Sequence, residues 1–266
     1  MPGDSSSRPD LRHQQDEPAL QGSPGLSSLV ADIGDLLFST IRIARALTSA
    51  TGRSVVWTRL RYRAALHQSA TTTIEDRYPA LFDAIAVRRP KLLLSFGCST
   101  GEELVALRRR LPAAHIVGVE LNPRARRLAR QRTANDSRIE VVERLPLGPF
   151  DAVLALAVLQ REPHRVIEEG IADLTCLYPF PRFDAALTEL VERLRAGGTL
   201  ALHHAHYRAE DSSVAPLLTA VDGPPQQLPP LFDRSSRRYD PPVEAASLFI
   251  KADDRCAATT ATSPSS

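Results

Sequence analysis

Short apolar runs alternate with segments of helical periodicity over the middle of the chain. A buried parallel strand reads as a continuous apolar run, and such runs occur at residues 91–96, 115–120, 138–142, 150–157 and 199–203. Helical patterns separate them, at residues 102–111, after 122, at 161–172 and at 184–194. Strands and helices that alternate in this way form a parallel sheet with right-handed crossovers. The pattern therefore predicts an α/β fold.

The two ends of this α/β segment carry other patterns. Helical spacing over residues 26–47, 55–68 and 73–87 predicts an N-terminal helical cap over 24–89. Such a cap either covers the carboxyl ends of the strands or forms a homodimer contact, and both remain open. A last strand is expected at 246–251, which gives a main domain of 90–251. Residues 1–23 and 252–266 are polar and are expected to be disordered tails.

Local residues are expected to set several of these boundaries. Asn122 and Pro123 supply an N-cap and a first-turn proline for the helix after the second strand. Gly197 and Gly198 are expected to end the helix at 184–194. A Pro-rich loop at 222–230 separates the fifth strand from the last one.

Composition narrows the function classes only slightly. The 266 residues carry a formal net charge of +2, which gives no strong field for nucleic acid. The three cysteines have no CxxC spacing, so we expect no disulfide framework, no metal site and a cytoplasmic location. Residues 1–10 lack the apolar core of a signal peptide, and residues 26–47 are too charged to span a membrane.

The candidate site is the sequence KLLLSFGCSTGEE at residues 91–103. An apolar strand runs into a turn with Gly97, Ser99 and Gly101, and a helix follows. Glycines let the backbone approach a ligand closely, and the helix N-terminus presents free N–H groups to it. Glu120 stands 19 residues after Gly101, at the end of the second strand. A carboxylate in that place can accept hydrogen bonds from both hydroxyls of a ribose.

Other interpretations of the same turn fit less well. Residues 97–101 also match G-x-S-x-G, with Ser99 as a hydrolase nucleophile and His203, His204 or His206 as base. That motif needs an oxyanion-hole loop, and no glycine run occurs before residue 91. The dinucleotide fingerprint and the P-loop pattern both fail on spacing or on the missing lysine. The turn therefore favours a ligand without a pyrophosphate.

Four motifs in order resemble class I S-adenosylmethionine-dependent methyltransferases. LLLSFGCSTGEE is similar to their first motif and VGVELNP to their acidic second-strand motif. FDAVLALAVLQ is similar to the fourth-strand motif, and LRAGGTLAL resembles the turn into strand five, with Ala196 where proline is usual. The resemblance covers about residues 91–207. It implies a Rossmann-like, mostly parallel seven-stranded sheet of order 3-2-1-4-5-7-6.

The resemblance also implies roles for individual residues. Glu120 would hold the ribose of S-adenosyl-L-methionine, and Leu121 would pack on the adenine. Ala157 and Val158 would lie near the methyl group. Ser95 stands where an acidic residue often opens the first motif. The positions of the first motif that would contact the cofactor are Ser95, Phe96, Gly97, Cys98, Ser99 and Gly101.

The acceptor side is less defined. The Asn/Asp-Pro-Pro-aromatic motif that serves amino acceptors is absent, since AVLQREP follows strand four. His203 and His206 are candidates for a general base, with structural histidines as the alternative. Tyr78, Gln160 and Tyr207 are candidate acceptor-binding residues.

The expected activity is methyl transfer to a small-molecule acceptor, at oxygen. The alternatives are a cofactor-binding scaffold without turnover and, less favoured, the serine hydrolase.

Overall fold

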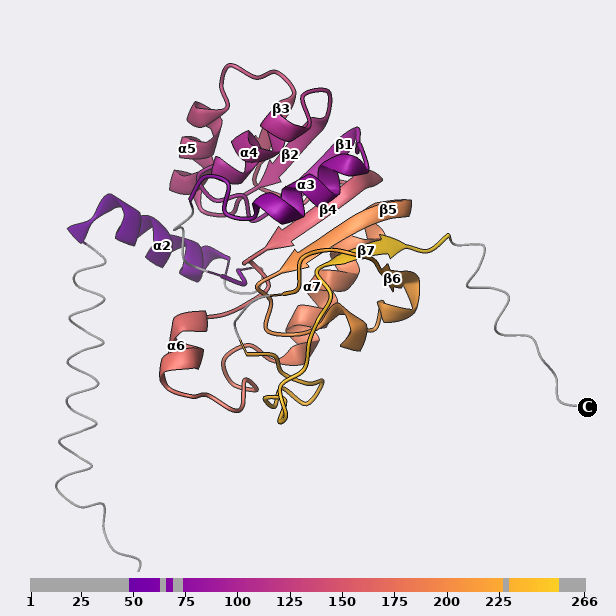
Figure 1. Ribbon diagram of the computed structural model, residues 1–266. Helices are drawn as coiled ribbons and strands as arrows, with labels where there is room; N and C mark the ends of the chain where they lie inside the picture. Colours follow the sequence, from indigo (N-terminus) through magenta and orange to yellow (C-terminus); the bar gives the residue numbers. More distant parts are fainter. Residues whose placement is uncertain (1–47, 63–65, 69–73, 227–229, 254–266) are drawn as a thin grey trace, which may run out of the picture. The chain divides into compact units, whose positions relative to one another are not determined.

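The computed structural model describes residues 48–62, 66–68, 74–226 and 230–253 (Figure 1). Its centre is a seven-stranded sheet of order β3-β2-β1-β4-β5-β7-β6, which confirms the predicted order. Strands β1 to β5 are parallel, and β7 runs antiparallel to both of its neighbours. The strands are β1 Leu92–Phe96, β2 His115–Val119, β3 Ile139–Val142, β4 Phe150–Leu156, β5 Leu194–His203, β6 Leu218–Ala220 and β7 Leu248–Lys251.

Helices cover both faces of this sheet (Figure 1). Side chains of α3 and α4, with Ala129 of α5, share one core with Leu93 of β1 and Leu154 of β4. Residues of α7 share a second core with Leu94 and Val153, which point to the opposite face by strand alternation. The helices are α2 Ala50–Arg61, α3 Pro79–Val87, α4 Glu102–Arg110, α5 Pro123–Arg132, α6 Pro163–Glu168 and α7 Phe180–Glu192, with 3₁₀ turns at Ala209–Asp211 and Ala215–Leu217.

Helices α4 and α5 begin directly after the residues that follow β1 and β2. Asn122 caps α5, since its side-chain oxygen accepts the N–H groups of Arg124 and Ala125 at 3.0 and 3.1 Å. Pro123 occupies the first turn, as predicted. Helix α4 begins after Gly101, whose φ of +90° is a conformation that glycine adopts readily. Both helix N-termini therefore face the carboxyl ends of the strands.

The N-terminal segment departs from the prediction. The expected helix at 26–47 and the tail at 1–23 lie outside the described residues, as does 254–266. The helix expected at 55–68 is α2, which ends at Arg61. The helix expected from 73 starts at Pro79 and packs on α4 and β5. Helix α3 thus belongs to a helical layer on the sheet, whereas α2 and residues 66–68 lie at the strand ends.

Gly197 and Gly198 do not end a helix, which corrects the prediction for this pair. Helix α7 already stops at Glu192, and both glycines lie inside β5. The pairing of β5 with β4 shifts between Leu194 and Thr199. Gly197 has a φ of +69°, so the glycines permit an irregularity in the strand rather than a helix end.

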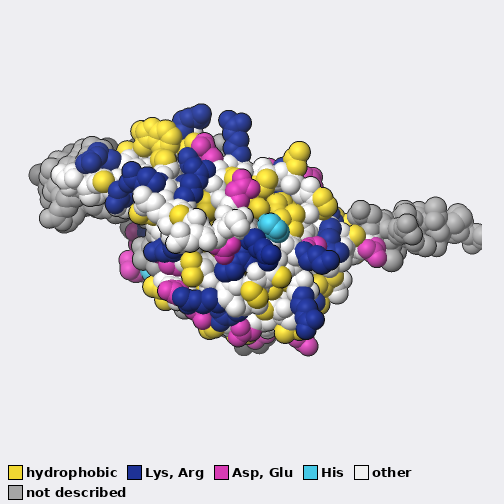
Figure 2. Space-filling view, turned by 90° about the horizontal axis from the view of Figure 1, so that it is seen from above, with side chains coloured by type: hydrophobic (Ala, Val, Ile, Leu, Met, Phe, Trp, Pro, Cys, Tyr) yellow, Lys and Arg dark blue, Asp and Glu magenta, His cyan; other side chains and the backbone are white. Residues whose placement is uncertain are grey.

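Ten arginines among the described residues form ion pairs with acidic side chains. Arg110 at the end of α4 contacts Asp76 and Asp83 at 2.8 and 2.5 Å, and Arg109 pairs with Glu75. Figure 2 shows one face of the molecule, on which basic and acidic side chains stand among each other. This agrees with solvated helix faces. Among the described helices, none has both the length and the apolar character needed to cross a membrane.

Candidate functional site

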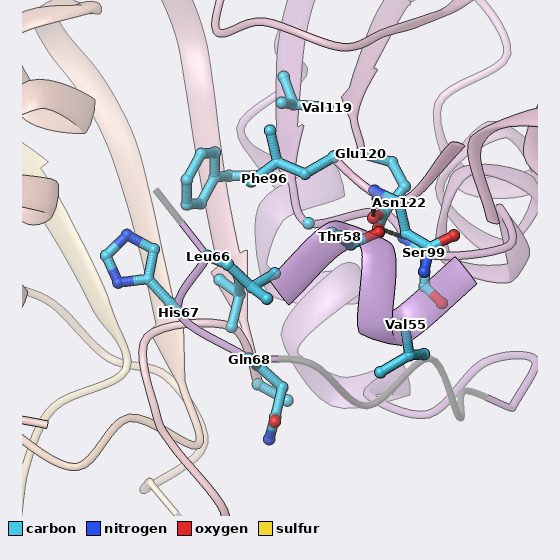
Figure 3. Close-up of a pocket in the computed structure, with 14 residues that line it drawn as sticks. Val55, Thr58, Leu66, His67, Gln68, Phe96, Ser99, Val119, Glu120 and Asn122 are labelled. Atoms are coloured by element: carbon cyan, nitrogen blue, oxygen red, sulfur yellow. Dashed lines mark hydrogen bonds between the residues drawn. The ribbon is translucent and has the colours of Figure 1, made fainter. Parts of the chain in front are cut away.

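A cleft lies at the carboxyl ends of β1, β2 and β4, where the sequence places the glycine turn (Figure 3). It holds about 620 Å³ of space, part of it open to solvent. Helix α2 and residues 66–68 form its outer wall. The lining residues are Val55, Thr58, Leu66, His67, Gln68, Phe96, Gly97, Ser99, Val119, Glu120, Leu121, Asn122, Ala157 and Val158.

Gly97 is the first residue of the turn after β1, and a side chain at this position would be strained and would clash. Its φ is +81°, and a Cβ on it would lie 2.7 Å from Cγ2 of Val158. The N–H groups of Gly97 and Cys98 both donate to the carbonyl of Val119, at 2.9 and 3.0 Å. The hydrogen bonds join the turn after β1 to the end of β2, and Val158 after β4 lies close to Gly97.

Glu120 connects the glycine turn to the start of α5. One carboxylate oxygen accepts the N–H of Ser99 at 2.9 Å, and the other accepts the N–H of Asn122 at 2.7 Å. Burial raises the pKa of Glu120, and these two hydrogen bonds partly oppose that rise. Each carboxylate oxygen can accept a further hydrogen bond. The residue can therefore hold the turn and still accept hydroxyl groups of a ligand.

Helix α2 is attached beside this carboxylate by polar contacts. The hydroxyl of Ser54 donates to Oδ1 of Asn122 at 2.7 Å, and Tyr62 donates to Glu143. Val55 and Thr58 of α2 line the cleft. The helix is thus positioned by the same asparagine that caps α5.

Residues 66–68 form the roof of the cleft, and two arginines hold their main chain. Arg182 donates to the carbonyl of Leu66 at 2.6 Å. Arg161 donates to the carbonyls of Leu66 and His67, each at 3.3 Å. The ring of His67 lies beside Phe96, with 6.2 Å between centroids, and its Nδ1 lies 2.6 Å from the hydroxyl of Tyr178.

The structure brings most of the predicted cofactor residues into this cleft, although their roles remain predictions. Ser95 and Cys98 are buried and do not line the cleft. Gly101 packs closely against Ala129, so that a Cβ on it would lie 3.0 Å from the Cα of Ala129. The predicted residues that line the cleft are Phe96, Gly97, Ser99, Glu120, Leu121, Ala157 and Val158.

A carboxylate stands behind the turn next to Ser95. The Ser95 hydroxyl donates to Glu103 of α4 at 2.7 Å. Burial raises the pKa of Glu103 to about 7. The sequence places no acid at position 95, and the fold brings one to it from the next helix.

The predicted catalytic histidines do not line the cleft. His206 is fully buried, and its Nε2 lies 2.9 Å from the carbonyl of Arg161. His203 is also buried, and its Nδ1 lies 2.6 Å from Nδ1 of His204. The two neighbours meet because His204 has a φ of +51°, which breaks the strand alternation that would separate them. Neither histidine is a lining residue of this cleft, and a general base from His203 or His206 stays a prediction.

The candidate acceptor-binding residues also lie elsewhere. Tyr207 is fully buried, and its hydroxyl donates to the carbonyl of Tyr178 at 2.5 Å. Tyr78 packs on the ring of His203 at 5.0 Å between centroids. Gln160 is buried and donates to the carbonyl of Ala157 at 3.1 Å. Each of the three supports the site from behind and none lines the cleft.

His67 is the functional candidate that sequence reasoning missed. It lies in the segment 55–68, for which the sequence predicts a helix, and a single histidine within a helical pattern gives no signal of its own. Its position depends on Arg161, Tyr178 and Arg182, which lie about a hundred residues further along the chain. In the part of the chain that the structure describes, no group of three or more potential metal-ligating side chains occurs.

Comparison with known proteins gives a match over the centre of the chain. Residues 94–202 match a family model described as a methyltransferase domain. This segment runs from β1 to β5 and contains the glycine turn, Glu120 and the end of β4. A search of curated protein sequences finds no match.

Solved structures show more distant likenesses. The cofactor-bound protein Rv0187 from MTB is 18% identical, with 91% of this chain and 100% of that chain covered at a TM-score of 0.43. The SAH-bound methyltransferase PaMTH1 of Podospora anserina is 16% identical, with a TM-score of 0.35. The match covers 68% of this chain and 72% of that chain. A StiE O-MT segment is 22% identical, with a TM-score of 0.31. The match covers 45% of this chain and only 39% of that segment. These likenesses are too distant to bear on function.

Proposed function

We propose, from the premise that residues 94–202 belong to the methyltransferase-domain family, that the protein transfers a methyl group to an oxygen atom of a small-molecule acceptor. The matched segment is a class I, Rossmann-like domain, a class that takes its methyl group from S-adenosylmethionine. One observation carries the proposal: the Glu120 carboxylate hydrogen-bonds to the glycine turn in a cleft with apolar walls.

The residues present fit this cofactor. Gly97 leaves room that a Cβ would fill, and Glu120 keeps acceptor capacity for the two hydroxyls of a ribose. Leu121 and Val55 offer apolar surface for a base, and Phe96, Ala157 and Val158 offer it near the methyl group. When bound, S-adenosylmethionine supplies an already activated methyl group, so positioning provides most of the rate.

Two observations support a small acceptor and an oxygen atom. Residues 66–68 and α2 cover the cleft, so the open part admits a small molecule more easily than a folded polymer. After β4, at residues 157–163, the chain reads AVLQREP and lacks the motif that serves amino acceptors. An oxygen acceptor agrees with this absence, and His67 and Gln68 offer polar groups at this end of the cleft.

Calorimetry with S-adenosylhomocysteine and S-adenosylmethionine tests the cofactor site directly. We expect both compounds to bind. If neither compound bound, the proposal would be overturned. Transfer of labelled methyl from S-adenosylmethionine to a panel of hydroxyl, carboxyl, amino and thiol compounds then identifies the acceptor atom. Transfer to amines alone would replace oxygen by nitrogen. Binding without transfer to any compound would favour the scaffold function.

A further inference from the structure

His67 is the histidine that the fold places in the cleft (Figure 3). Its side chain stands beside Phe96, at the end of the cleft away from Glu120 and Asn122. Only 6% of the residue is exposed, and the neighbours that line this end are mostly apolar. A buried polar ring costs free energy unless its nitrogens are satisfied. Its hydrogen bonds therefore show what the ring can offer a ligand.

Tyr178 determines which ring nitrogen carries the hydrogen. The Tyr178 side chain is fully buried, and among the described residues its hydroxyl has Nδ1 of His67 as partner, at 2.6 Å. A buried hydroxyl satisfies its hydrogen by donating it. Nδ1 then accepts, and Nε2 carries the hydrogen of the neutral ring. Burial, together with the charges of Arg182 and Arg161, lowers the pKa of His67 to about 4, so the ring stays neutral near pH 7.

Arginine side chains lie next to this end of the cleft, outside its lining residues. Arg161 and Arg182 hold the carbonyls next to the ring, and the charge of Arg59 from α2 acts on Arg161. Burial lowers the pKa of Arg161, yet an arginine stays protonated in a protein. Glu162 is the acidic group that acts on Arg161 from the other side. The charges of Arg182 and Arg161 both act on His67, which gives this end a positive potential that the apolar surroundings strengthen.

We propose that the acceptor binds here as an oxyanion, a carboxylate or an ionised phenol, with the Nε2–H of His67 donating a hydrogen bond to it. Arg161 and Arg182 stabilise its negative charge. The inference rests on the proposed methyl transfer. The acceptor oxygen gains the methyl group, its charge is cancelled as the sulfonium loses its own, and no proton moves. The site therefore needs a donor and positive charge rather than a general base.

The carboxylate of the cofactor's own amino-acid part is the second possible source of this anion. It has the same chemistry, and a site for it would also contain a donor and arginines. The two sources differ in what a change at position 67 affects. An acceptor site alters binding of added acids and leaves the cofactor's affinity unchanged. A cofactor site does the reverse.

Binding of benzoate to the full chain saturated with S-adenosylhomocysteine tests the proposal. We expect benzoate to bind and uncharged benzamide to bind at least 10-fold more weakly. His67→Ala should weaken benzoate binding 10-fold or more. His67→Gln should stay within about 3-fold of the wild type, because the Gln amide also donates. His164→Gln, on exposed residue His164 of α6, is the matched control and should change nothing.

Nitrogen-15 spectra of the imidazole rings provide a measurement that a purely structural role would not alter. We expect the hydrogen of neutral His67 on Nε2, a shift of this signal with benzoate, and a change of tautomer population in Tyr178→Phe. A hydrogen on Nδ1, or no binding of benzoate, would overturn the proposal.

The cofactor provides the remaining comparison. Weaker binding of S-adenosylhomocysteine to His67→Ala, with methylthioadenosine unaffected, would assign the anion to the cofactor and overturn the acceptor assignment. Failure of the wild type to bind S-adenosylhomocysteine would instead overturn the proposed function itself.

Discussion

The carboxylate of Glu120 accepts the N–H of Ser99 at 2.9 Å and so joins the end of β2 to the turn after β1. The same carboxylate accepts the N–H of Asn122 at 2.7 Å. One side chain therefore fixes the relative position of the glycine turn and the N-terminus of α5. A ligand that binds between these two elements meets a site that is already formed.

Replacing Glu120 by alanine should weaken cofactor binding. Loss of hydrogen bonds to a charged group costs about 1.5–3 kcal/mol, which raises the Kd for S-adenosylhomocysteine roughly 10- to 150-fold. Calorimetry measures this change. Glu140→Ala, at an exposed glutamate of β3, is the control and should bind as the wild type does. An unchanged Kd in Glu120→Ala would contradict the assigned pocket.

Gly97→Ala should destabilise the fold through two separable effects. The φ of +81° costs about 1–2 kcal/mol for a residue with a side chain. The contact with Val158 at 2.7 Å adds about 1–3 kcal/mol. Gly170→Ala isolates the first effect, because Gly170 has a φ of +61° and nothing lies within 4 Å of its Cβ position.

Chemical denaturation of the single variants and of Gly97→Ala/Val158→Ala separates the two contributions. We expect the double variant to recover the contact part relative to Gly97→Ala and to retain the φ part. Equal stability of Gly97→Ala and Gly170→Ala would show that the approach to Val158 carries no cost.

Glu103 makes stability depend on pH near neutrality. Burial raises its pKa to about 7 in the folded state, well above that of the unfolded chain. Between the two values the folded state holds a proton that the unfolded state has lost. Stability is therefore greatest below the unfolded pKa and falls as pH rises toward 7, by at most about 3 kcal/mol.

Glu103→Gln should remove this dependence, because the amide oxygen still accepts the Ser95 hydroxyl without a charge. We expect the variant to be more stable than the wild type at pH 8 and similar at pH 5. Denaturation curves at both pH values measure the difference. A wild type that gains stability between pH 5 and 7, with Glu103→Gln showing the same gain, would contradict the buried carboxyl.

Asn122 should couple the cap of α5 to the attachment of α2. Asn122→Ala removes the cap and costs about 0.5–2 kcal/mol of global stability. Ser54→Ala removes only the 2.7 Å bond from α2 and should leave global stability nearly unchanged. Both variants should speed amide hydrogen exchange in α2. Unchanged exchange in α2 of Ser54→Ala would show that other contacts hold the helix.

The central sheet could be predicted from sequence because its signals are local. Apolar runs, the Asn122–Pro123 pair and the spacing from the glycine turn to Glu120 each specify a nearby conformation. Strand β6 has three residues, Leu218–Ala220, and is too short to show any periodicity. The expected sheet order includes a sixth strand, but the sequence gives no residue range for it.

The end of the cleft at His67 could not be predicted, because tertiary contacts determine it. His203 ends β5 and His206 follows it, in the expected place, yet their rings turn into the protein and contact His204 and the carbonyl of Arg161. His67 reaches the cleft only because arginines from distant elements hold its main chain. A homodimer through the N-terminal helices stays a prediction, as do the cap and tail boundaries.

The clamp on residues 66–68 has a consequence for how this protein can change over evolution. Arg161 and Arg182 bind carbonyl oxygens of Leu66 and His67, and every residue type has a carbonyl. These main-chain hydrogen bonds do not use the side chain at position 67, whereas the contact with Tyr178 does. A substitution at position 67 should therefore change what the side chain offers to a ligand and leave the main-chain contacts of Leu66 and residue 67 in place.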